Sequence, residues 1–332
     1  MKLSGQRKFL QAAILIIAFL TLAGCDKTTQ TPATPTTKPT IESTAAPAVI
    51  PASLILVDAA GSAPLNIQES LQTFAATNTL EFRTSIDFTF DFAEVKIVVV
   101  LDAGSDFQEL VNAHPDVQFL FIGESSTPVG GNISIIKNKP EDLAFMAGQL
   151  TTLVSEDWRS GGLLNANGAA IEVISDAFVN GGNYVCGWCK PTYPPYLSYP
   201  VYQDISGKAG AEMIADVEAL SVNWVAVTFV SRAADLPEVI EALQTAEIAM
   251  IGENANSAEA GRYAAILGFG AGTALEVMLP KLLAGEGGQE AVSRVVLVVV
   301  NDETLVTPGR QDLFNMAAEA LQGGWIIPLS VR

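Results

Sequence analysis

Short runs of apolar, β-branched residues alternate with amphipathic stretches from residue 52 to the end of the chain. An uninterrupted run such as residues 295–300 is typical of a strand that is covered on both faces, as in a parallel sheet. The runs predict strands at residues 54–57, 96–101, 117–122, 222–230, 248–251 and 295–300. Between them the spacing of apolar residues predicts helices at residues 67–76, 141–154, 169–179, 210–220, 235–245, 273–283 and 311–321. This alternation predicts an α/β fold in which right-handed crossovers connect parallel strands.

The length of the patterned region predicts two lobes. About 280 residues are too many for one hydrophobic core. We expect the first lobe to hold residues 52–157 and a later segment near 255–285, and the second to hold residues 158–254 and a C-terminal portion. Ligands of open parallel sheets bind beyond the carboxyl ends of the strands, so a cleft between the two lobes is the expected binding site.

The first 51 residues have the pattern of an export signal followed by a spacer. Lys2, Arg7 and Lys8 precede an apolar run over residues 9–22, and Leu22-Ala23-Gly24-Cys25 follows. The run is too short for a stable membrane span and predicts a secretory leader over residues 1–24, although an uncleaved anchor helix is the alternative. The small residues before Cys25 resemble a bacterial lipobox, which implies that Cys25 carries lipid and anchors the chain to the extracytoplasmic face of the membrane. Residues 26–51 are rich in Thr, Pro and Ala, and we expect them to form a tether.

Charge and histidine content exclude several classes of function. The chain has 18 Lys and Arg against 36 Asp and Glu, a formal net charge of −18, which argues against nucleic acid as a partner. Its single histidine, His114, excludes a metal site built from several histidines. A Ser-His-Asp or Cys-His mechanism would depend on that one residue. We therefore predict a protein without metal, cofactor or enzymatic activity.

Two short motifs favour structural roles. Cys186-Gly187-Trp188-Cys189 resembles a redox-active C-x-x-C, but residues 190–195 contain three prolines and cannot continue as a helix. We expect a local disulfide between Cys186 and Cys189 in an exported chain. The glycine-rich stretch at residues 268–272 imitates a dinucleotide fingerprint, but Thr273 stands where the third glycine belongs. We expect a flexible crossover between the lobes there.

Several segments resemble, in the right order, those of the basic-membrane-protein (Bmp) family of substrate-binding lipoproteins. The resemblance rests on HPDVQF at residues 114–119, EDLAFMAG at 141–148, Gly161-Gly162 with Phe178 and Gly181 downstream, and AMIG at 249–252. It implies a type I periplasmic-binding-protein fold with two lobes, each a parallel sheet flanked by helices. It also implies an ABC permease as partner and a purine nucleoside as ligand.

Three departures from the family pattern bear on the ligand. The loop at residues 58–66 lacks the family's base-stacking aromatic residue, and the family's I-G-V-D-S-D is IGENAN at residues 251–256. Residues 268–272 contain no lysine. Amides and carboxylates with few cations suit a neutral, hydroxyl-rich solute better than a phosphate, which would need helix N-termini with Arg or Lys.

The fold places candidate ligand contacts at the strand ends. Asp106 lies within one residue of a ligand-contacting aspartate of the family, and Phe178 occupies the position of a family aromatic residue, with a place in the core as its alternative. For the polar residues, solvated loops are the alternative. The candidates in the first lobe are Asp58, Asn66, Asp102, Ser105, Asp106, Glu124 and Ser125, and those in the second are Asn165, Asn167, Phe178, Ser231, Arg232, Glu253, Asn254 and Asn256.

These patterns predict a monomeric, lipid-anchored solute receptor of an ABC importer. The alternative is a degenerate family member that acts as a sensory or protein-contacting surface lipoprotein. The missing aromatic residue and the Tyr- and Pro-rich residues 193–199 motivate it.

Overall fold

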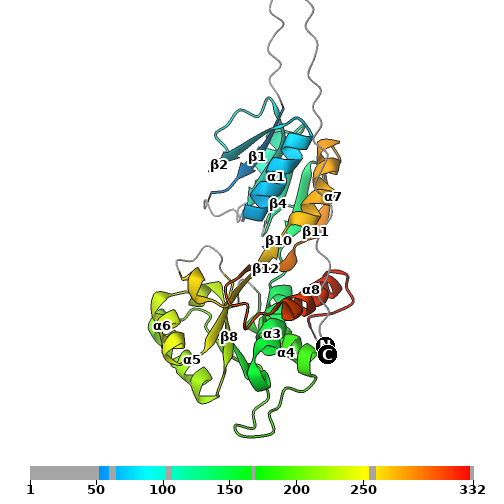
Figure 1. The fold of residues 1–332 in the computed structure, drawn as a ribbon. Helices are drawn as coiled ribbons and strands as arrows, with labels where there is room; N and C mark the ends of the chain where they lie inside the picture. Colours follow the sequence, from blue (N-terminus) through cyan, green and yellow to red (C-terminus); the bar gives the residue numbers. More distant parts are fainter. Residues whose placement is uncertain are drawn as a thin grey trace, which may run out of the picture. The chain divides into compact units, whose positions relative to one another are not determined.

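The computed structural model describes residues 52–59, 65–101, 107–123, 125–166, 169–253 and 259–329. The predicted leader, Cys25 and the predicted tether lie outside these residues. Within them the chain forms two six-stranded sheets (Figure 1), and no helix is long and apolar enough to cross a membrane.

The first sheet is parallel throughout and has the strand order β11-β5-β4-β3-β1-β2. Its strands are β1 (Ser53–Val57), β2 (Glu81–Ser85), β3 (Val95–Leu101), β4 (Gln118–Ile122), β5 (Ile133–Lys137) and β11 (Glu290–Val292). Helices α1 (Leu65–Thr77) and α7 (Gly272–Leu283) cover one face, and their apolar residues form one core with Leu54, Ile97 and Leu120. The lobe therefore takes a helix and a strand from late in the chain.

The opposite face of the first sheet has an unusual cover. A short helix, α2 (Gln108–Ala113), lies there beside residues 86–94, which are not helical. Phe88, Phe90 and Phe92 alternate along that segment and pack onto the core of β1, β3 and β4. Three phenylalanine rings thus replace the helix that normally connects two parallel strands.

The second sheet has the order β12-β10-β9-β8-β6-β7. Its strands are β6 (Ser160–Leu164), β7 (Val201–Asp204), β8 (Val227–Val230), β9 (Ala249–Gly252), β10 (Ala265–Gly270) and β12 (Arg294–Val300). Helices α3 (Pro140–Val154), α4 (Ile171–Cys186) and α8 (Pro308–Gln322) cover one face, while α5 (Gly210–Val222) and α6 (Pro237–Thr245) cover the other (Figure 1). The predicted α/β architecture of two lobes, each a sheet flanked by helices, is confirmed.

Two expectations about individual elements need correction. The run at residues 295–300 was expected to be a parallel strand buried on both faces, but β12 pairs antiparallel with β10 at the edge of the sheet. Its Val298 is 44% exposed. The first lobe was expected to extend to residue 157, but α3 packs against α4 in the core of the second lobe. The chain changes sheets between β5 and α3, at Ala271 between β10 and α7, and at Ser293 between β11 and β12.

Candidate ligand-binding site

The carboxyl ends of β6, β8 and β9 bring four predicted site residues to one edge of the second sheet, namely Asn165, Ser231, Arg232 and Glu253. These strands are neighbours and parallel, with Leu163 paired to Val230 and Val230 paired to Gly252. The backbone N–H of Ser231 donates to Leu163 O at 3.1 Å, and that of Glu253 donates to Val230 O at 3.2 Å. The ladder therefore continues one residue beyond each strand, and Ser231 and Glu253 leave the sheet side by side.

Glu253 is tied to the segment that carries Arg232. Its Oε2 accepts the backbone N–H of Arg232 at 2.8 Å, at the start of the 3₁₀ turn η2 (Arg232–Ala234). Burial raises the pKa of Glu253, while the Arg232 N–H and the guanidinium charge act in the opposite direction. The Arg232 side chain itself is exposed. The edge thus presents a desolvated carboxylate next to an exposed guanidinium, an arrangement that can accept from and donate to hydroxyl groups.

Ser231 contributes a buried hydroxyl. Only 2% of the residue is exposed, and its Oγ has no hydrogen-bond partner among the described residues. A buried hydroxyl without a partner costs about 1–3 kcal/mol. A polar ligand group at this edge would remove that cost.

A tyrosine and an aspartate that the sequence analysis did not single out support this edge. The Tyr263 hydroxyl donates to Asp235 Oδ1 at 2.8 Å, and Asp235 directly follows η2. Tyr263 is buried, and burial together with the Asp235 carboxylate raises its pKa, so the hydroxyl keeps its proton. A Cβ on Gly252 would crowd the Tyr263 ring, so the glycine at the end of β9 lets that ring pack. The contact holds in place the turn that positions Arg232.

The remaining second-lobe candidates divide into three groups. Asn165 follows β6 at the same edge and is half-buried. Asn167, Asn254 and Asn256 lie outside the described residues. Phe178 is fully buried in the core, 6.4 Å from Phe229 between ring centroids, because the apolar face of α4 packs onto the sheet. Phe178 is therefore a core residue, which was the alternative to a ligand contact, and it does not line the candidate site.

The first lobe offers fewer described groups at its carboxyl edge. Asp58 follows β1, is half-buried, and donates its backbone N–H to Ser85 O at 2.9 Å. Asn66 is the second residue of α1. The Ser125 hydroxyl accepts the N–H of Thr127, and Thr127 Oγ1 accepts the N–H of Phe107 at 3.0 Å, which ties the loop after β4 to the start of α2. The other candidates, Asp102, Ser105, Asp106 and Glu124, lie outside the described residues.

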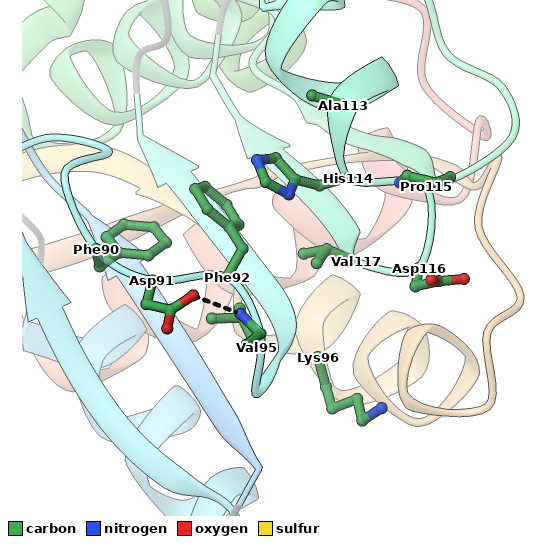
Figure 2. A pocket seen from close by; sticks show the side chains of 11 residues that line it. Phe90, Asp91, Phe92, Val95, Lys96, Ala113, His114, Pro115, Asp116 and Val117 are labelled. Atoms are coloured by element: carbon green, nitrogen blue, oxygen red, sulfur yellow. Dashed lines mark hydrogen bonds between the residues drawn. The ribbon is translucent and has the colours of Figure 1, made fainter.

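A cavity of about 890 Å³ lies at the other edge of the first sheet, where β3 and β4 begin (Figure 2). Phe92 and His114 stack in its wall with ring centroids 3.9 Å apart, and Lys96 and Asp116 flank it. The Asp91 carboxylate is engaged locally by the N–H of Ala93 at 3.0 Å. Because it opens at the amino ends of the strands, this cavity is distinct from the expected ligand-binding edge.

The two short motifs lie in structural positions. Cys186 and Cys189 form a disulfide, and Cys186 is the last residue of α4. The N-terminal helix position that activates a redox cysteine is therefore absent here. Gly268 and Gly270 lie inside β10, where side chains would crowd Val298 and Val296 of β12, and the crossover follows at Ala271. Among the described residues no cluster of His, Cys, Asp and Glu could hold a metal ion.

Comparisons with known proteins define the fold. No family model matches the chain, and neither does any curated protein. An ABC transporter solute-binding protein from Conexibacter woesei DSM 14684 has a TM-score of 0.56 at 13% identity, covering 83% of this chain and 97% of its own. A transcriptional activator of the comK gene from Bacillus halodurans also has a TM-score of 0.56 at 13% identity, covering 83% and 99%. A solute-binding protein from Aeropyrum pernix K1 has a TM-score of 0.52 at 11% identity, covering 83% and 93%.

The chain has the type I periplasmic-binding-protein fold. Its neighbours with this fold include both solute-binding proteins of ABC transporters and a transcriptional activator. The fold is therefore shared by proteins with different roles, and the role of this chain has to be argued from its own residues.

Proposed function

We propose that the chain is an extracytoplasmic solute-binding lipoprotein of an ABC importer, anchored through Cys25. It takes a neutral, hydroxyl-rich solute, with nucleosides as the favoured class, between the carboxyl edges of its two sheets. The observation that carries the proposal is the cluster of Ser231, Arg232 and Glu253 at the ends of adjoining strands. Ligand capture would favour a closed arrangement of the lobes, which a permease in the membrane would select.

The chemistry of the cluster supports the ligand class. The Glu253 carboxylate can accept from two hydroxyls, and the Ser231 hydroxyl can both donate and accept. The cluster supplies one cation, Arg232, whose backbone N–H is already used by Glu253. A phosphate would need several charged donors at one point, so a sugar hydroxyl pair fits these groups better.

Thermal unfolding of the purified protein tests the proposal. The ligands to be compared are purine and pyrimidine nucleosides, free bases, pentoses and amino acids. A ligand at a hundredfold excess over its dissociation constant stabilises by about 2.7 kcal/mol, which raises the unfolding midpoint by several degrees. A shift with nucleosides or sugars supports the proposal, whereas a shift with amino acids alone reassigns the ligand.

Matched variants locate the binding site. Ser231→Ala and Glu253→Gln should each raise at least tenfold the ligand concentration that is needed for a given midpoint shift. The reason is that each substitution removes a group that pairs with a ligand hydroxyl. Arg83→Ala removes an exposed cation that pairs with Glu81 on β2 and should leave binding unchanged. Equal binding by all three variants would contradict the site.

The alternative is a sensory or protein-contacting lipoprotein. The exposed tyrosines of the Pro-rich segment before β7, Tyr193 and Tyr196, favour it. The absence of a midpoint shift with every solute tested would move the assignment to this role.

A further inference from the structure

The amino ends of β6, β7 and β8 form an edge with an unusual composition. The residues that precede these strands come from η1 (Glu156–Trp158), from the loop after α4 and from the turn after α5. Because the three strands are parallel, this edge is opposite to the one that carries Glu253. Its exposed rings, here called the aromatic edge, belong to Trp158, Trp188, Tyr193, Tyr196 and Trp224.

Arg159 organises the centre of the aromatic edge. Its guanidinium lies 5.0 Å from the ring centroid of Tyr193 and 5.2 Å from that of Trp224, and it donates to Pro194 O at 3.2 Å. The residue is 7% exposed, so its charge is enclosed while the two rings stay 45% and 62% exposed. Cation–π contacts on one side of a ring fix its position and leave its other side open. The rings are thus held in place but remain available.

The backbone holds two of the tryptophans in a costly conformation. Trp158 has φ +61° and Trp224 has φ +57°, a region that bulky residues rarely adopt. Each such residue costs about 1–2 kcal/mol. Glycine would occupy either position without strain. Thr79 and Glu247 have the same positive φ in the turns after α1 and α6, so Trp224 is held in a turn that ends a helix, and its ring position is fixed by that turn.

The loop that carries Trp188, Tyr193 and Tyr196 is fixed at both ends. The Cys186–Cys189 disulfide closes its start, and the backbone N–H of Tyr199 donates to Cys189 O at 2.8 Å. The hydroxyl of the buried Tyr199 donates to Asn223 O at 2.6 Å, next to Trp224. The loop is therefore pre-organised beside the Trp224 turn, which lowers the entropy cost of binding a partner of defined shape.

We propose that the aromatic edge binds a neutral polysaccharide chain. Pyranose rings present flat C–H faces and a rim of hydroxyls, which match ring faces whose edges carry the Tyr hydroxyl and the Trp N–H. The enclosed Arg159 and the net charge of −18 disfavour a polyanion or an anionic lipid surface. Several rings along one edge favour a polymer over a single sugar, because weak stacks add up when they are linked.

Native affinity electrophoresis of the full-length protein tests this proposal. The gels would contain soluble dextran, xylan or mixed-linkage β-glucan, and sedimentation with cellulose and chitin would complete the panel. At least one neutral polymer should retard or retain the protein. The double variant Tyr193→Ala/Trp224→Gly should weaken that binding at least tenfold. The glycine removes the ring and suits the backbone at φ +57°, so the fold should survive, which a single cooperative unfolding transition verifies.

Controls separate this surface from other exposed tryptophans and from the proposed solute site. Trp325→Ala removes a ring that is 87% exposed beyond α8 and should leave polymer binding intact. Ser231→Ala should also leave it intact, so this inference can hold even where the proposed function fails. Absence of binding to every neutral polymer, or equal binding by the double variant, would overturn the proposal. Polygalacturonate, a polyanion, and phosphatidylcholine vesicles serve as two further probes. The proposal would also be overturned if the double variant lost binding to either of these probes while its binding to the neutral polymers stayed unchanged.

Discussion

The backbone of Gly181 in α4 lies directly against the carbonyl oxygen of Phe145 in α3, so closely that a Cβ on Gly181 would overlap it. The relation is reciprocal, because a Cβ on Gly148 would overlap the carbonyl of Phe178. Each helix carries Phe-x-x-Gly, and each glycine admits the other helix. We predict that Gly181→Ala lowers the free energy of unfolding by at least about 2 kcal/mol, since the two backbones must move apart.

Gly309 supplies the matched control for that substitution. It lies in the first turn of α8, where a Cβ would meet open space. Gly309→Ala should stabilise the protein by about 0.5 kcal/mol, because alanine restricts the unfolded chain. Urea denaturation of the three proteins measures both effects. Equal midpoints for Gly181→Ala and Gly309→Ala would show that the helices do not need their close contact.

This helix pair also shows what the apolar pattern of the sequence could reveal. The spacing of Leu143, Met146 and Leu150 predicts a helix, and α3 is there. The spacing does not say which sheet the helix covers, because both sheets offer an apolar face. The close contact between the two Phe-x-x-Gly motifs places α3 beside α4 on the second sheet. The sequence does not reveal this contact, because the two glycines show their complementarity only once the helices are packed together.

The apolar pattern of the sequence does not predict the strands that are mostly exposed. β2 (EFRTS) and β11 (EAV) lie at the edges of the first sheet and have mostly exposed or half-buried residues. An edge strand needs no long apolar run, so periodicity does not reveal it. In the candidate site, Ser231 and Glu253 do lie at strand ends, but their position side by side depends on the strand order, which the sequence pattern does not give. The bond between Asp235 and Tyr263 joins residues 28 apart and has no local signal.

The stability of the protein should depend on pH through Asp142 in the first turn of α3. Burial raises the pKa of this carboxyl from 3.8 to about 6, a change that Lys139 opposes and Glu141 assists. Below about pH 3.8 both states are protonated and nothing is lost. As the pH rises towards 6, the folded state holds its proton more tightly than the unfolded state, so stability falls, and above 6 the loss is complete.

Asp142→Asn keeps the size of the side chain and removes this loss. We predict that it raises the free energy of unfolding by about 1–2 kcal/mol at pH 7, less than the full linkage value because solvent reaches part of the carboxyl. The gain should vanish near pH 3.5, and most of it should survive in 1 M NaCl because burial, not charge, is its main cause. Unfolding midpoints at three pH values measure it, and a gain that is the same at all of them would refute the assignment.

The segment that replaces a helix on the first sheet should be essential through its inward rings. Phe92 stacks on His114 at 3.9 Å and lies 4.7 Å from Phe90 between centroids. Phe92→Ala should cost about 2–3 kcal/mol of stability, because it leaves a void beside the sheet. Ile86 belongs to the same segment but is 72% exposed, so Ile86→Ala should change stability by less than about 0.5 kcal/mol. If both variants lost a similar amount of stability in urea denaturation, the inward-facing rings of residues 86–94 would not be what holds this segment on the sheet.

The Cys186–Cys189 disulfide should matter for the aromatic edge and not for the proposed solute site. It closes a loop of four residues, and the chain-entropy relation assigns such a loop about 2 kcal/mol. The variant Cys186→Ala/Cys189→Ala should lose about that much stability. Hydrogen exchange should become faster in residues 190–198, whose start the disulfide fixes.

The position of the disulfide determines which of the two proposed binding activities depends on it. It lies at the amino ends of the strands, whereas Ser231 and Glu253 lie at the carboxyl ends, so solute-induced shifts of the midpoint should persist in the double alanine variant. Retention by a neutral polysaccharide should weaken, because the disulfide no longer holds Trp188 at the start of the loop. Dithiothreitol should reproduce both results in the parent protein and change nothing in the variant. Loss of solute binding with intact polysaccharide retention would assign the loop to the solute site instead.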